Sequence, residues 1–261
     1  MRRIAVTVPL VLAALAVLFT GAVPASAATG QVLLAATFPK TTTAKLVTNE
    51  YAYRNPRRTD RVVSPTWEMT SGSLFALAGN AWTGKVDNGR PDATSAKATN
   101  SAVFRMRSRT STYGDVSVTT GLAVSRLTTT ASTPRQNWDG VHLWLRYRSE
   151  FSLYAVSVAR RDGVVVIKKK CAGGPSNDGT YYTLRQVKGV PIPLGAWRTV
   201  AASARNNPNG TVTLTASVGG KVVTTATDAG IGCAAIRAAG RVGVRGDNTE
   251  FRFTKLTVTA L

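Results

Sequence analysis

The pattern of hydrophobic and polar positions predicts a chain made almost entirely of β-strands. Short runs rich in Val, Thr, Leu, Tyr and Phe recur along the chain, and Gly, Asn, Asp or Pro residues separate them. Asp162-Gly163 and Gly219-Gly220 lie between two such runs and predict tight hairpin turns. The predicted strands cover residues 73–77, 101–108, 115–125, 140–148, 152–160, 163–170, 180–185, 197–205, 211–218, 221–227, 240–245 and 250–259.

The segment from Gly140 to Glu150, GVHLWLRYRSE, alternates strictly enough to assign the two faces of a strand. One face then holds Val141, Leu143, Leu145 and Tyr147, and the other holds His142, Trp144, Arg146, Arg148 and Glu150. We expect the first face in the core and the second at a ligand. A row of His, Trp and Arg is unusual for a merely solvated face, where Thr, Ser, Lys and Glu are commoner.

Residues 1–27 have the pattern of a secretory signal peptide. Arg2 and Arg3 precede an apolar run, and the small residues Ala25-Ser26-Ala27 form a cleavage site. We therefore expect a secreted, extracellular protein that begins near Ala28 and has no membrane association after cleavage. An uncleaved anchor is the alternative, because the apolar run is long enough to span a bilayer.

The chain is strongly basic, with 33 Lys and Arg residues against 13 Asp and Glu and a formal net charge of +20. Such a charge attracts polyanions. Outside a cell the expected partners are an extracellular polysaccharide or an anionic wall polymer, and no specific nucleic acid is expected. The basic residues are scattered along the chain, so solubility alone is a competing explanation. We expect a monomer.

The two cysteines, Cys171 and Cys233, predict one disulfide in an exported protein. Two buried thiols are the alternative. The disulfide would join the Gly-rich segment after Cys171 to another loop. Loops fixed on a rigid scaffold often carry binding residues, so Asn177, Asp178, Tyr181 and Tyr182 are expected at the mouth of the ligand site.

Three stretches of the sequence, taken in order, resemble one known superfamily. They are WDGVHLWLRYRSEFSLYAVSVARRDGVVVIKKK, LGAWRTVAASARNNPNGTVTLTASVGGKVV and GRVGVRGDNTEFRFTKLTVT. Over residues 65–261 they resemble the concanavalin A-like lectin/glucanase superfamily, with its laminin-G-like and glycan-active relatives. The resemblance implies an all-β fold, a jelly-roll β-sandwich of two antiparallel sheets. Residues 28–261 would form a single domain, with 28–64 as a less regular N-terminal wrap.

This fold hosts lectins, binding modules, glycosidases and polysaccharide lyases, so the fold alone does not define a function. Laminarinase-like glycosidases of the superfamily carry Glu-x-Asp-x-x-Glu on one strand, which sets two carboxylates at the spacing of retaining cleavage. This sequence lacks that triplet, and a glycosidase is the less favoured enzyme. A single histidine and the lack of a Cys-x-x-Cys pair exclude the common zinc sites.

A polysaccharide lyase is the main enzymatic alternative. Such an enzyme needs a base beside the uronate carboxylate and a cation that stabilises the resulting charge. His142 would be the base, Tyr182 the acid and Arg146 the cation. The alginate-lyase patterns Arg-x-Glu-x-Arg, Gln-x-His and Tyr-Phe-Lys-x-Gly are not found, so whether the protein is an enzyme stays open.

The leading hypothesis is a secreted carbohydrate-binding protein that recognises an acidic polysaccharide through a basic sheet face with aromatic residues. Each residue also has a purely structural interpretation, as core, as a solvated strand face or as a buried hydrogen-bonded histidine. No organic cofactor is expected. The resemblance also suggests a structural Ca²⁺ at Asp247 and Asn248, although six or more oxygen ligands cannot be assembled from spacing. The candidate ligand-binding residues are Trp82, Arg105, Arg107, His142, Trp144, Arg146, Lys168, Lys170, Asn177, Tyr181 and Tyr182.

Overall fold

A computed structural model describes residues 28–89, 102–176 and 178–261. These residues form two antiparallel sheets. The seven-stranded sheet has the order β11-β10-β9-β8-β15-β6-β3. Its strands are β3 (Trp67–Ser71), β6 (Val103–Ser108), β8 (Gly140–Ser149), β9 (Ser152–Val158), β10 (Val165–Ala172), β11 (Gly179–Val187) and β15 (Arg241–Asp247).

The second sheet has ten strands in the described part of the chain. Its main path runs β14-β13-β12-β7-β16-β5-β4-β2, and β17 joins β1 to β7. The strands are β1 (Val32–Ala36), β2 (Lys45–Asn49), β4 (Ser73–Leu77), β5 (Asn80–Trp82), β7 (Val116–Leu127), β12 (Arg198–Asn206), β13 (Val212–Val218), β14 (Lys221–Asp228), β16 (Thr249–Phe253) and β17 (Leu256–Ala260).

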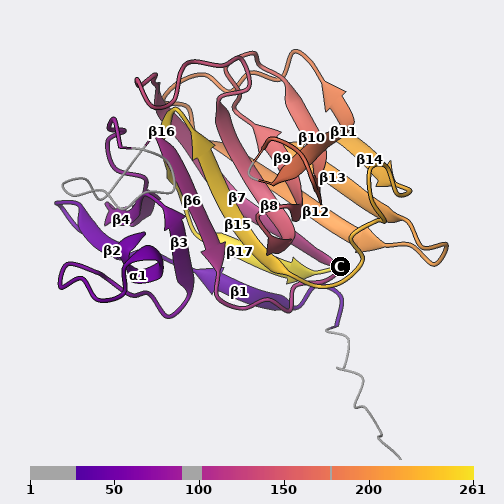
Figure 1. Cartoon of the computed structure of the whole chain (residues 1–261), viewed down its shortest axis with the longest axis horizontal. Coiled ribbons are helices and arrows are strands. Elements are labelled where there is room, and N and C mark those ends of the chain that lie inside the picture. The colour runs from indigo at the N-terminus through magenta and orange to yellow at the C-terminus, as the bar shows by residue number, and fades with distance from the viewer. Residues whose placement is uncertain (1–27, 90–101, 177) are drawn as a thin grey trace, which may run out of the picture.

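The two sheets stack face to face, with β2, β3 and the short helix α1 (Tyr51–Arg54) at one end and β11 and β14 at the other (Figure 1). Their facing sides form one apolar core, to which alternate positions of each strand contribute. In β8 these inward residues are Val141, Leu143 and Leu145, as the alternation predicts. The protein therefore has a jelly-roll β-sandwich fold of two antiparallel sheets.

The predicted strands match the observed ones except near the chain ends. Strands β1, β2, β3 and β5 were not predicted, and the predicted strand 250–259 is two strands, β16 and β17, separated by Thr254 and Lys255. Residues 28–64 hold β1, β2 and α1, and both strands pair with the ten-stranded sheet. These strands are only three to five residues long, and so short a run gives a weak sequence pattern, which explains why they were missed.

The alternation along β8 breaks at Arg146, so the predicted faces of Arg146 and Tyr147 are wrong. Arg146 has a φ angle of 49°, and the register with both neighbouring strands shifts there. Such a bulge turns the following residue to the other face. Arg146 is fully buried away from the outer face, whereas Tyr147 joins Trp144 on the outer face, with ring centroids 5.0 Å apart.

Candidate functional site

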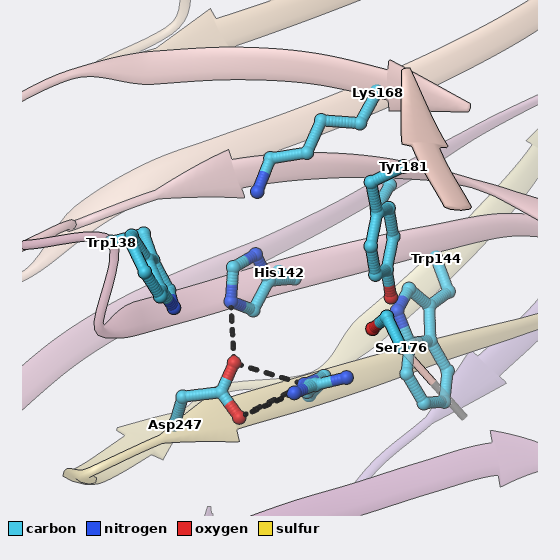
Figure 2. A pocket seen from close by; sticks show the side chains of 9 residues that line it. Trp138, His142, Trp144, Lys168, Ser176, Tyr181 and Asp247 are labelled. Carbon is cyan, nitrogen blue, oxygen red and sulfur yellow. Dashed lines mark hydrogen bonds and ion pairs between the residues drawn. The ribbon is translucent and has the colours of Figure 1, made fainter. Parts of the chain in front are cut away.

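A pocket of about 270 Å³ opens on the outer face of the seven-stranded sheet. Figure 2 shows it with His142 at its centre and with Trp138 and Tyr181 on opposite sides of the imidazole. This volume lies near the lower end of the range for small-ligand sites. The lining residues come from β8, β9, β10, β11, β15 and two loops, and they are Trp138, His142, Trp144, Ala155, Lys168, Ser176, Tyr181, Arg245 and Asp247.

Small residues on the two neighbouring strands leave room for the indole ring of Trp144. Trp144 pairs with Ala155 of β9 on one side and Gly243 of β15 on the other. A Cβ atom at Gly243 would lie 3.0 Å from Trp144 Cε3. The indole can therefore lie over Gly243 and line the pocket, although Trp144 itself is only 3% exposed.

Three buried residues, Ser157, His142 and Asp247, are joined by hydrogen bonds at the base of the pocket. His142 Nδ1 lies 2.6 Å from Ser157 Oγ, and Nε2 lies 3.0 Å from Asp247 Oδ2. Burial lowers the pKa of His142 to about 4, although the hydrogen bond to Asp247 opposes this. The imidazole is therefore neutral at pH 7. Its Nε2–H donates to Asp247, and Nδ1 accepts the hydroxyl proton of Ser157.

This arrangement contains a Ser-His-Asp set, but it does not have the features of a nucleophilic triad. Ser157 is fully buried and is not among the residues that line the pocket. Both ring nitrogens of His142 already have hydrogen-bond partners. These hydrogen bonds instead fix the carboxylate of Asp247, which also forms an ion pair with Arg245 at 2.8 Å. Burial would raise the pKa of Asp247, but Arg245 and His142 together hold it well below its usual value.

Lysines 168 and 170 stand on either side of the Tyr181 ring. Their Nζ atoms lie 5.5 Å and 5.2 Å from the ring centroid. Burial lowers the pKa of Lys168, and the positive charges of Arg160 and Arg245 lower it further, to about 8. The cations in and around the pocket therefore repel one another, so an anion placed among them would be stabilised.

The disulfide between Cys171 and Cys233 is confirmed. It lies at the end of β10, just before the loop that contributes Ser176 to the pocket. Hydrogen bonds from Gly173 N to Asp178 O and from Ser176 N to Gly179 O hold this loop as a closed turn. The cross-link therefore holds one end of the loop that forms a pocket wall.

The structure brings together four of the predicted ligand residues in the pocket and places two more beside it. His142, Trp144, Lys168 and Tyr181 line the pocket. Arg105 and Lys170 line an adjoining small cavity, described below. Arg107 lies on the same face but is paired with Glu68 Oε2 at 2.7 Å and with the Tyr147 hydroxyl.

Three predicted residues lie elsewhere. Trp82 belongs to β5 of the other sheet, where it packs against Phe75 and donates to Glu250. Tyr182 points to the opposite face from Tyr181, because neighbouring strand residues alternate, and its ring packs against Gly232. Arg146 is itself the bulge residue and is fully buried, so its predicted place on the outer face is wrong. Asn177 lies outside the described residues.

Sequence reasoning missed Trp138, Ser176 and Arg245. Trp138 lies in the loop before β8 and is half-exposed. The sequence QNWDG does not reveal this exposure, because a loop tryptophan can equally be a packing residue. Arg245 was overlooked because its face could be assigned only once β15 was known to pair with β8 and β6.

The suggested calcium ligands are engaged in other contacts. Asp247 binds Arg245 and His142, and the Asn248 side chain donates to Thr133 O, Pro134 O and Asp139 Oδ2. Within the described ranges, no group of three or more His, Cys, Asp or Glu side chains is placed to hold a metal ion. No helix in the described part of the chain is long and apolar enough to cross a membrane.

Comparisons with known proteins agree with this architecture. No family model matches the sequence, and no curated protein matches it. Among solved structures, β-agarase B from Zobellia galactanivorans is similar, with a TM-score of 0.51, 8% identity and coverage of 83% of this chain and 94% of that one. LamA from the same organism, in complex with laminaritriose and laminaritetraose, has a TM-score of 0.50, 7% identity and coverage of 89% and 100%. At such identities the likeness concerns the fold alone.

Proposed function

We propose that this protein binds an acidic polysaccharide outside the cell, with one sugar residue held in the pocket. The aromatic rings of Trp138 and Tyr181 supply surfaces on which sugar rings stack, and Trp144 contributes the edge of its indole. Lys168 and Arg245 supply positive charge to an acidic substituent. The leader at residues 1–27 and the disulfide favour a secreted protein, and we expect a monomer.

The observation that carries the proposal is the Trp144 side chain. Its Nε1–H is buried and has no hydrogen-bond partner among the described residues. An unsatisfied buried donor costs about 1–3 kcal/mol. In Figure 2 the indole nitrogen lies on the edge turned toward Tyr181 and Ser176. A sugar hydroxyl or ring oxygen in the pocket would accept this hydrogen bond, and the aromatic ring beside it would stack.

Glycan-bound neighbours give support at the level of the fold. β-Agarase B has been solved with agaro-octaose at a TM-score of 0.51, and LamA with laminari-oligosaccharides. The lyase alternative has less support, because neither Arg146 nor Tyr182 lines the pocket. His142, its proposed base, is neutral but has both nitrogens engaged. We therefore favour binding over proton abstraction.

Binding to immobilised neutral and acidic polysaccharides, at low and high salt, tests the proposal. We expect one acidic polymer to stay bound at moderate salt, whereas adhesion through scattered surface charge weakens steeply as charges are screened. Ultraviolet absorbance of the same wells detects the unsaturated product of a lyase. New absorbance would replace the binding proposal by the lyase.

Matched variants localise the site. Trp138→Ala and Lys168→Met should each weaken binding by about tenfold. Trp197→Ala and Lys221→Met are the controls, because both residues are exposed and neither lines the pocket. Trp197 directly precedes β12 and Lys221 begins β14, and both strands belong to the ten-stranded sheet. Equal losses in the controls, or no salt-resistant binding to any polymer, would refute the proposed site.

A further inference from the structure

A second, much smaller cavity adjoins the pocket, and we call it the slot. Trp144, Tyr181 and Arg245 line both, so the two are continuous. The slot has about 10 Å³ of space, which is close to what a single water-sized group occupies. A sugar ring does not fit there, but one oxygen of a substituent does.

The slot is the more positive of the two compartments. Arg105, Lys170 and Arg245 line it together with one carboxylate, that of Glu150. Arg105 and Arg245 are direct cross-strand partners on β6 and β15, so their side chains emerge side by side. The pocket has a smaller excess of positive charge, because Lys168 and Arg245 line it together with Asp247, and His142 is neutral.

We propose that the slot receives the anionic substituent of the sugar whose ring fills the pocket, so the ligand is a polymer of sugars that each carry a carboxylate or sulfate. This inference rests on the proposed function and narrows it. Recognition would then depend on the acidic group of one bound residue. Charge spread along the polymer would contribute little.

The state of Lys170 supports this assignment. Its side chain is almost fully buried, at 2% exposure. Burial lowers its pKa to about 8, and Arg245 and Arg105 act in the same direction. An anion in the slot would offset both the burial and the repulsion, so binding favours the charged lysine. Affinity for the acidic ligand should therefore fall as the pH rises above 8.

The test compares acidic polymers with their neutralised forms. The probes are polygalacturonate, alginate and a carrageenan, each beside its carboxyl-reduced or desulfated derivative, and the readout is the ratio of the two dissociation constants. The carboxylate and sulfate polymers distinguish the two sources of the anion. We expect the wild type to bind the neutralised polymer more weakly than the acidic one, by about tenfold or more. We expect Lys170→Met to bind the acidic and the neutralised polymer equally well. Lys170→Arg should restore the ratio and extend acidic binding above pH 8.

Glu150→Gln gives a test in the opposite direction, at a partly exposed position where a folding defect is not expected. Removing its negative charge should tighten binding of the acidic form about threefold and leave the neutral form unchanged. Glu250→Gln, the same change on the ten-stranded sheet, is the control.

The outcomes separate the two proposals. If the wild type binds an acidic polymer but Lys170→Met keeps the wild-type ratio and Glu150→Gln changes nothing, the slot assignment is wrong and the proposed function stands. If Lys168→Met is the only variant that binds the acidic and the neutralised polymer equally well, the acidic group lies in the pocket and not in the slot. If none of the three acidic polymers binds, both proposals fall.

Discussion

Arg146 gives the sharpest test of how this face is built. Its guanidinium donates to Asp115 Oδ1 at 2.7 Å, to Asn206 Oδ1 at 2.8 Å and to Ile236 O at 2.7 Å. Its side chain is fully buried, while that of Asp115 is 34% exposed. Arg146→Ala would remove these hydrogen bonds and open a cavity behind the bulge, although Asp115 Oδ1 would still accept from Asn206 N.

The expected loss follows from these contacts. Removing one partner of a buried ion pair costs about 3–5 kcal/mol. Because water can reach the Asp115 carboxylate, we expect the low end, about 3 kcal/mol in the free energy of unfolding. Urea denaturation followed by tryptophan fluorescence measures it. Arg148→Ala, at the exposed position two residues on, should change stability by less than about 0.5 kcal/mol.

Polysaccharide affinity of the same variants gives the second half of the test. Arg146→Ala should keep wild-type affinity at temperatures where it remains folded, because Arg146 does not line the pocket. A variant with wild-type stability and lost binding would show that Arg146 contacts the ligand and that our account of the bulge is wrong.

Three further predictions follow from the same structure. Cys171 and Cys233 close a loop of 62 residues, so replacing both by Ala should cost at most about 4 kcal/mol, measured by urea unfolding beside a reduced wild-type sample. Burial lowers the pKa of His142 from its usual 6.5 to about 4, so the unfolded chain takes up this proton first as the pH falls. The free energy of unfolding should therefore keep its full value above pH 6.5 and drop by up to about 3 kcal/mol by pH 4. In His142→Asn this part of the pH profile should be flatter. Lys168, with a pKa of about 8, should lose its charge between pH 7 and 9, so binding of an acidic polymer should weaken over that range in the wild type and less in Lys168→Arg, as measured by calorimetry.

The sequence was sufficient to predict the sandwich, the disulfide and the strands of the central part of both sheets. Long alternating strands such as β8, β12 and β13 give strong local patterns, and the expectation of export made the cysteine pair predictable. His142 and Trp144 could be predicted on the face that carries the pocket because they precede the bulge. Up to Leu145, a period of two describes β8 correctly.

The rest of the site depends on strand pairing, which local pattern does not encode. Arg105 and Arg245 meet only because β6 pairs with β15, although about 140 residues separate them. Tyr181 and Tyr182 are neighbours in sequence, and only the register of β11 decides which one faces the pocket. A single left-handed residue at position 146 reversed the faces of Arg146 and Tyr147.

That bulge has an evolutionary consequence. Trp144 and Tyr147 are three positions apart, and in a regular strand two such residues point to opposite faces. The one irregular residue between them lets a single strand offer two adjacent aromatic rings. Deleting Arg146 would restore a regular strand and still leave both rings on one face, because Trp144 and Tyr147 would then be two positions apart. The core stripe before the bulge would stay intact, but the buried arginine would be lost. Descendants of one ancestor could thus share the sandwich and the aromatic pair and differ abruptly in this buried arginine through a single insertion or deletion.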